Sequence, residues 1–228
     1  METVFIITGV NRGLGEALYN ELIQLKATVF AISRRFNENQ KPKDNTIHWQ
    51  KDLINLNEEE LTNHLKPIYP KHKNIIYINN AATINPIGKV GSFTEKEIRN
   101  SYNLNVITPV LLSNHILKNT TKNQKIVFLN ISSGAAKRPI AGWSLYNSTK
   151  AANEMFYNCI VNDNVTVLNI NPGVINTKMQ DTIRKSNMPD VADFINLQKE
   201  NKLQEPKDVA IKILTELYEN SHIIRHTR

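Results

Sequence analysis

Residues 4–15 read VFIITGVNRGLG, an apolar run of strand length that passes through a glycine-rich turn into a segment of helical period. The three glycines, Gly9, Gly13 and Gly15, stand where a backbone must turn tightly and come close to a pyrophosphate. Amides at the start of the following helix then face the anionic oxygens. A glycine triplet alone marks only a turn, but its position between a strand and a helix predicts a nucleotide site.

Further apolar runs of strand length alternate with helical patterns along the rest of the 228 residues. They occupy residues 28–32, 47–50, 75–79, 126–131 and 165–170, and a weaker candidate lies at 222–225. Buried parallel strands read as continuous apolar runs, and the segments between them act as right-handed crossovers. We therefore expect one α/β domain over residues 1–228, a doubly wound Rossmann fold with a mainly parallel sheet of six to seven strands.

Composition excludes several classes of protein. The net charge is +7, but the Lys and Arg residues are scattered, so we expect no nucleic-acid partner. No apolar run approaches the length of a membrane span, and no export signal precedes the first strand. The single cysteine, Cys159, lies in an apolar helical pattern that indicates packing, and it fits a reducing cytoplasm. We expect no membrane partner and no metal site.

The spacing Thr-Gly-x-x-x-Gly-x-Gly at residues 8–15 resembles the short-chain dehydrogenase/reductase family, and the resemblance covers nearly the whole chain. Residues 79–82, Asn-Asn-Ala-Ala, are similar to the family's Asn-Asn-Ala-Gly turn, with Ala82 in place of the usual glycine. The resemblance implies cofactor contacts from Gly9, Asn11, Arg12, Gly13, Leu14 and Gly15, from Asp52 and Leu53, and from Asn80 and Ala81.

The end of the second strand indicates which nicotinamide cofactor is bound. NAD selectivity normally uses a carboxylate there, but this chain has Ser33, Arg34 and Arg35. Together with Arg12 these side chains would form charge-assisted hydrogen bonds to a 2'-phosphate. We therefore expect NADP(H); the alternative is that Arg34 and Arg35 are only exposed loop charges.

Tyr146 and Lys150 are four residues apart, which places a phenol and an ammonium group on one face of a helix. A nearby cation lowers the pKa of a tyrosine, and the site needs that shift for acid–base chemistry. The spacing is common on surface helices, so it carries weight only with its context.

The family resemblance supplies that context. It implies that Ser133 polarises a substrate carbonyl, with Ser132 as the alternative serine, and that Asn105 supports a water joining the lysine to solvent. The implied catalytic set is Asn105, Ser133, Tyr146 and Lys150. The Pro-Gly segment after the sixth strand resembles the family's nicotinamide-binding segment, with contacts from Pro172, Gly173, Ile175 and Thr177.

A substrate space is expected between residues 135–145 and a flap at 177–206, lined by Ile140, Trp143, Met179, Ile183 and Met188, although core packing is the alternative for each. Within the family, residues 133–137, 142–143 and 176–180 resemble sepiapterin reductases and bacterial benzil reductases. That resemblance implies NADPH-dependent reduction of a ketone, with a vicinal dicarbonyl as the first candidate.

Two other functions remain open at this point, a non-catalytic NADP(H)-binding redox sensor and a nucleic-acid binder. The resemblance also implies a homodimer through helices in 94–118 and 146–161, with a tetramer as the alternative.

Overall fold

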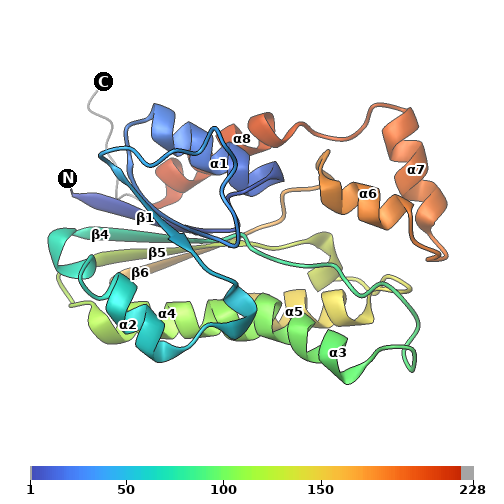
Figure 1. Ribbon diagram of the computed structural model, residues 1–228, viewed down its shortest axis with the longest axis horizontal. Coiled ribbons are helices and arrows are strands. Elements are labelled where there is room, and N and C mark those ends of the chain that lie inside the picture. Colours follow the sequence, from blue (N-terminus) through green and yellow to red (C-terminus); the bar gives the residue numbers. More distant parts are fainter. Residues whose placement is uncertain (1, 222–228) are drawn as a thin grey trace.

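The computed structural model describes residues 2–221, which form a parallel sheet with helices on both faces (Figure 1). Its six strands are β1 (Thr3–Thr8), β2 (Thr28–Ser33), β3 (Thr46–Gln50), β4 (Asn74–Asn79), β5 (Lys125–Ile131) and β6 (Val165–Ile170). They lie in the order β3-β2-β1-β4-β5-β6, and every neighbouring pair is parallel. The predicted doubly wound fold is confirmed, while the candidate strand at 222–225 lies outside the described residues.

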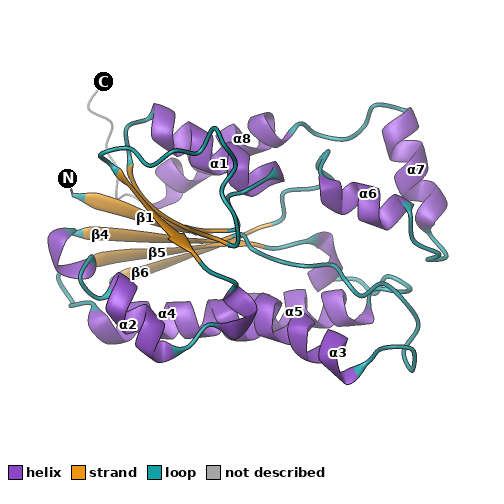
Figure 2. Cartoon of the chain, viewed as in Figure 1, coloured by secondary structure: helices purple, strands orange, loops and turns teal. Residues whose placement is uncertain are grey.

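Helices alternate with these strands and form a layer on each side of the sheet (Figure 2). The main helices are α1 (Gly13–Gln24), α2 (Glu58–Leu65), α3 (Glu95–Tyr102), α4 (Thr108–Asn119), α5 (Ser144–Asn158), α6 (Lys178–Arg184), α7 (Val191–Lys199) and α8 (Pro206–Ser221). One layer contains α1 and α8, and the other contains α2, α4 and α5 (Figure 1). None of the helices in the described part of the chain is long and apolar enough to cross a membrane.

Strand β1 shows why the middle of each central strand is a continuous apolar run. Phe5 and Ile7 belong to the core under α1 and α8, whereas Val4 and Ile6 belong to the core under α2, α4 and α5. Successive side chains of a strand point to opposite faces, and both faces of this sheet are covered. The continuous apolar runs of the sequence are the direct consequence.

A ladder of asparagines crosses the sheet near the carboxyl ends of β4, β5 and β6. Asn79 is in register with Asn130, and Asn130 with Asn169. The Asn79 amide donates to Asn130 Oδ1 at 2.9 Å, and the Asn130 amide donates to Asn169 Oδ1 at 2.8 Å. These bonds satisfy polar groups that would be costly to bury alone, and they depend on the register of the three strands.

Helix α5 packs differently from the sequence expectation. Its buried face carries Tyr146, Lys150, Asn153 and Tyr157. Cys159, at its carboxyl end, is exposed, so the expectation that it packs was wrong. The apolar residues near Cys159 in sequence did not predict its exposure, because α5 turns its face with Tyr146 and Lys150 to the protein interior instead.

Candidate active site

The glycine turn between β1 and α1 is held against the end of β4. The Asn80 amide donates to the main-chain oxygens of Thr8 (2.9 Å) and Gly9 (3.1 Å), and the Thr8 hydroxyl accepts from the amide nitrogen of Ala81 at 3.1 Å. A Cβ at Gly15 would overlap the Gly9 oxygen and the Asn80 amide. The turn therefore leaves no room for a side chain and brings the bare backbone to the amino end of α1.

This turn opens into a cavity of about 380 Å³ at the carboxyl ends of the strands, a volume usual for a small-molecule site. It lies where the strand order reverses between β1 and β4, the expected ligand position in such a sheet. The cavity brings together all but two of the predicted catalytic and cofactor-binding residues. They are Gly9, Asn11, Arg12, Gly13, Leu14, Gly15, Ser33, Arg34, Asp52, Leu53, Asn80, Ala81, Ser133, Tyr146, Lys150, Pro172, Gly173, Ile175 and Thr177.

The two exceptions are Arg35 and Asn105, which do not line the cavity. Arg12 and Arg34 do, from the glycine turn and from the end of β2. Both are exposed, and neither forms an ion pair within the described residues. Ser33 is buried beside Arg34. This end of the cavity thus presents two unpaired guanidinium groups and a hydroxyl, a donor set that fits a phosphate.

The turn after β4 accommodates the alanine at position 82. Among the described residues other than glycine, only Lys26 and Asn201 have a positive φ. Ala82 is therefore in ordinary backbone geometry, and its methyl group lines the cavity without backbone strain.

The Pro-Gly segment is fastened by a residue that the sequence did not single out. The Gln204 side chain donates to the Pro172 oxygen at 3.3 Å, and its backbone pairs with Val174 and Asn176. Gly173 has a φ of 75°, and a Cβ there would meet the Gln204 amide. Gln204 thus ties the end of the flap to the loop after β6. A lone glutamine outside any motif gave no signal for this contact.

Tyr146 lies on the first turn of α5 and is 6% exposed. Burial raises the pKa of its phenol to about 12, and the neighbouring Ser133 hydroxyl offsets part of that rise. The expectation that the pKa of Tyr146 is lowered is wrong for the protein chain by itself, because burial is the largest effect on this phenol. The phenol stays protonated throughout the neutral range and offers a proton beside the Ser133 hydroxyl.

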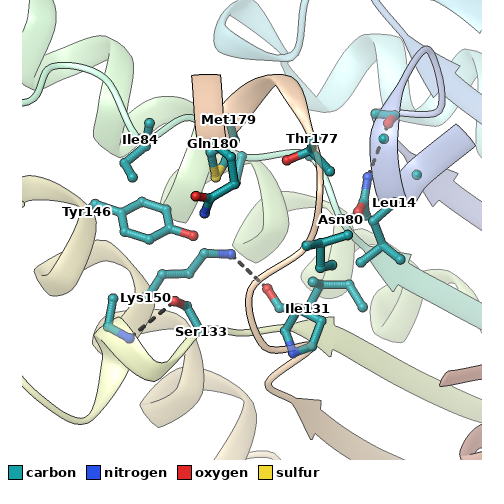
Figure 3. A pocket seen from close by; sticks show the side chains of 18 of the residues that line it. Leu14, Asn80, Ile84, Ile131, Ser133, Tyr146, Lys150, Thr177, Met179 and Gln180 are labelled. Atoms are coloured by element: carbon teal, nitrogen blue, oxygen red, sulfur yellow. Dashed lines mark hydrogen bonds between the residues drawn. The ribbon is translucent and has the colours of Figure 1, made fainter. Parts of the chain in front are cut away.

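Lys150 is 4% exposed, and its ammonium group donates to the main-chain oxygen of Ile131 at 2.7 Å (Figure 3). The Nζ atom lies 5.7 Å from the centroid of the Tyr146 ring. Burial lowers the pKa of Lys150 to about 8, and the carboxylate of Glu154 counters that shift. Glu154 is in turn held by the hydroxyl of Ser132 at 2.5 Å, so Ser132 faces this carboxylate.

The two serines after β5 therefore have different surroundings. Both serines line the cavity, but the Ser133 hydroxyl influences the pKa of Tyr146, whereas the Ser132 hydroxyl is 3% exposed and already bonded to Glu154. The geometry favours Ser133 as the group that can donate to a ligand oxygen together with Tyr146.

Asn105 lies in a π-helical turn, Asn103–Ile107, that interrupts the path from α3 to α4. Its amide donates to the Thr83 oxygen at 2.8 Å and to the Thr149 hydroxyl at 3.1 Å, and its Oδ1 accepts from the Thr83 amide at 2.8 Å. The main-chain oxygen of Asn105 accepts from the Asn153 amide. Asn105 thus joins the segment after β4 to α5, the helix that carries Tyr146 and Lys150.

An apolar cluster closes the other end of the cavity. Trp143 stands edge-on to Tyr146 with ring centroids 5.7 Å apart, and its Nε1 donates to Met188 Sδ at 3.2 Å. Four of the predicted substrate residues line the cavity, namely Ile140, Trp143, Met179 and Ile183. Met188 packs behind Trp143 instead of lining the cavity. The flap expected at 177–206 contains α6 and α7 and supplies one wall.

No three His, Cys, Asp or Glu side chains gather in the described part of the chain where they would hold a metal ion. The site instead combines a phosphate-fitting end, a buried phenol and lysine, and an apolar end. That combination suits a dinucleotide lying beside a small organic molecule.

Comparison with known proteins defines the class. The model of the short chain dehydrogenase family matches residues 3–188, and this chain belongs to that family of oxidoreductases. It is 33% identical to the benzil reductase ((S)-benzoin forming) of Bacillus cereus over 96% of this chain and 97% of that protein. The benzil reductase of Bacillus subtilis (strain 168) is 35% identical over 93% of this chain and 92% of its own length.

A solved structure also resembles this chain over nearly its whole length. The crystal structure of the KRED1-Pglu enzyme superposes with a TM-score of 0.82 at 26% identity, covering 96% of this chain and 95% of that one.

Proposed function

We propose that this protein is an NADPH-dependent carbonyl reductase that converts a ketone to an alcohol, with a vicinal dicarbonyl of benzil or sepiapterin type as substrate. The observation that carries the proposal is the meeting of Ser133, Tyr146 and Lys150 on the wall of the cavity that the glycine turn opens. A site for binding alone would need the turn and the basic residues but not a buried phenol with a lysine beside it.

In this mechanism Ser133 and Tyr146 both donate to the oxygen of the substrate carbonyl and polarise it. NADPH, when held in the cavity, would supply a hydride for the carbonyl carbon. As negative charge develops on the oxygen, Tyr146 transfers its proton there and completes the alcohol. Lys150, charged below its pKa of about 8, stabilises the phenolate that remains and favours its reprotonation.

We propose that Asn105 is a positioning residue. The water that the family resemblance implies between Lys150 and solvent would contact the main chain of Asn105. Its amide is already engaged by Thr83 and Thr149, so its side chain holds the π-helical turn against α5. In this role it fixes the helix that carries both Tyr146 and Lys150.

The preference for NADPH follows from charge. Arg12 and Arg34 line the cavity with no acidic partner among residues 2–221, and Ser33 adds a hydroxyl. No carboxylate follows β2 to bind the ribose hydroxyls of NAD. A 2'-phosphate would be held by charge-assisted bonds at this end. Arg35, which does not line the cavity, has a lesser part.

A homodimer through α4 and α5 is also proposed. Ile107, just before α4, is 48% exposed, and Met155 on α5 is 65% exposed. Contact with a second copy would remove such apolar side chains from water. A sedimentation experiment that finds only monomers at micromolar concentration would refute this assembly.

The direct test of the reaction is the decrease in NADPH absorbance when benzil is added, with NADH in parallel. Oxidation that depends on benzil and is faster with NADPH supports the proposal. A protein that binds NADPH but oxidises it with neither benzil nor sepiapterin would favour the alternative function, an NADP(H)-binding redox sensor.

A further inference from the structure

Gln180, in the first turns of α6, carries an amide that the protein leaves without a partner. The residue is 7% exposed and lines the cavity. Its Oε1 atom is buried and has no hydrogen-bond partner. No hydrogen bond joins its side chain to another described residue, while its backbone nitrogen donates to the oxygen of Thr177. The side-chain amide is therefore free to hydrogen-bond a molecule in the cavity.

The surroundings of Gln180 explain why the protein cannot satisfy this amide itself. The neighbouring flap residues Met179 and Ile183 are apolar, and Ile84 contributes a further apolar side chain to the same cavity. Figure 3 shows the Gln180 amide directed toward the part of the cavity that holds the Tyr146 phenol. A molecule whose reacting oxygen is bonded to Tyr146 would therefore place its adjacent atoms near Gln180.

We propose that the Gln180 amide hydrogen-bonds a second oxygen on the carbon next to the reacting carbonyl, and so selects vicinal dicarbonyl substrates over simple ketones. This inference rests on the proposed carbonyl reduction and specifies its substrate class. The NH₂ of the amide donates to the second carbonyl oxygen, while Tyr146 and Ser133 donate to the first. A half-turn about the last torsion of the side chain exchanges NH₂ and oxygen, so either end of the amide can face the ligand.

A pair of substrates isolates this bond. Benzil has two adjacent carbonyls, and deoxybenzoin is the same skeleton with one carbonyl replaced by CH₂. We expect Gln180→Met to lower kcat/KM for benzil by about tenfold and to leave that for deoxybenzoin within about twofold, because only benzil loses a hydrogen bond. Any difference in the intrinsic reactivity of the two ketones cancels when variant and wild type are compared on each.

Gln198→Met is the matched control. Gln198 is an exposed glutamine on α7, so this substitution makes the same chemical change away from the cavity. It should leave both substrates unaffected. NADPH affinity, measured by fluorescence titration, should be the same in Gln180→Met as in the wild type.

Three results would overturn the inference. One is an equal loss on benzil and deoxybenzoin, which would make Gln180 a general packing residue. Another is weakened NADPH binding, which would assign the amide to the nicotinamide carboxamide. The third is unchanged activity on both ketones. If the wild type reduces neither ketone, the proposed function itself has failed, which is a distinct outcome.

Discussion

Lys150 keeps an ammonium group in a site from which water is excluded, and this should make the stability of the protein depend on pH in a defined way. Burial lowers its pKa from 10.5 to about 8. The unfolded chain therefore binds more protons than the folded one between these two values. Stability must rise with pH through this window, because raising the pH removes the penalty for burying the charge.

The magnitude follows from the two pKa values. Below about pH 8 the penalty is near its full value, about 3 kcal/mol, since each pKa unit corresponds to about 1.4 kcal/mol. Between about pH 6.5 and about pH 9.5 the free energy of unfolding gains about 2 kcal/mol from this one group. In the variant Lys150→Met the hydrogen bond to the Ile131 oxygen is absent at every pH. Its loss therefore does not add to the pH dependence of the free energy of unfolding in that variant.

Urea unfolding of the wild type and of Lys150→Met at both pH values measures the effect. The wild type should gain about 2 kcal/mol more than the variant on going to the higher pH. Lys212→Met, which changes an exposed lysine on α8, is the control and should follow the wild type. Equal pH dependence in the wild type and Lys150→Met would show that Lys150 is not buried as an ion.

Three further substitutions test other parts of the site. Gly15→Ala should destabilise the fold by about 1–3 kcal/mol and abolish NADPH binding, because its Cβ overlaps the backbone of the turn; thermal unfolding with and without NADPH measures both effects, and unchanged binding would contradict the geometry. Arg34→Asp should lower the ratio of kcat/KM for NADPH to that for NADH by about tenfold or more, and Arg35→Asp should change it much less; equal effects would mean that the phosphate lies elsewhere. Glu154→Gln should lower the pKa of Lys150 further and move the alkaline loss of kcat to lower pH, with recovery in Glu154→Asp; an unmoved pH profile would remove Glu154 from the site.

The sequence predicted the fold well because its signals are local. A parallel strand buried on both faces is mostly apolar, so β1 and the five other strands were visible as apolar runs. The glycine turn was equally visible, since Gly15 has no space for any side chain. Both features are decided by residues that are adjacent in the chain.

The parts of the site that depend on distant segments were not predictable. Gln180 and Gln204 are single glutamines without a motif, and only the folded flap brings them to the cavity. The pKa of Tyr146 was predicted in the wrong direction because the four-residue spacing to Lys150 is readable, whereas the extent of burial is not. The role of Ser132 also became clear only when Glu154 was placed beside it.

The central claim is that Tyr146 is the proton donor for reduction of a ketone bound beside NADPH. The most direct measurement compares wild type and Tyr146→Phe for NADPH affinity and for benzil-dependent NADPH oxidation in the same buffer. The account predicts unchanged affinity and a loss of kcat of at least about a hundredfold in the variant, because phenylalanine keeps the ring and lacks the proton. Turnover by Tyr146→Phe at the wild-type rate would contradict it.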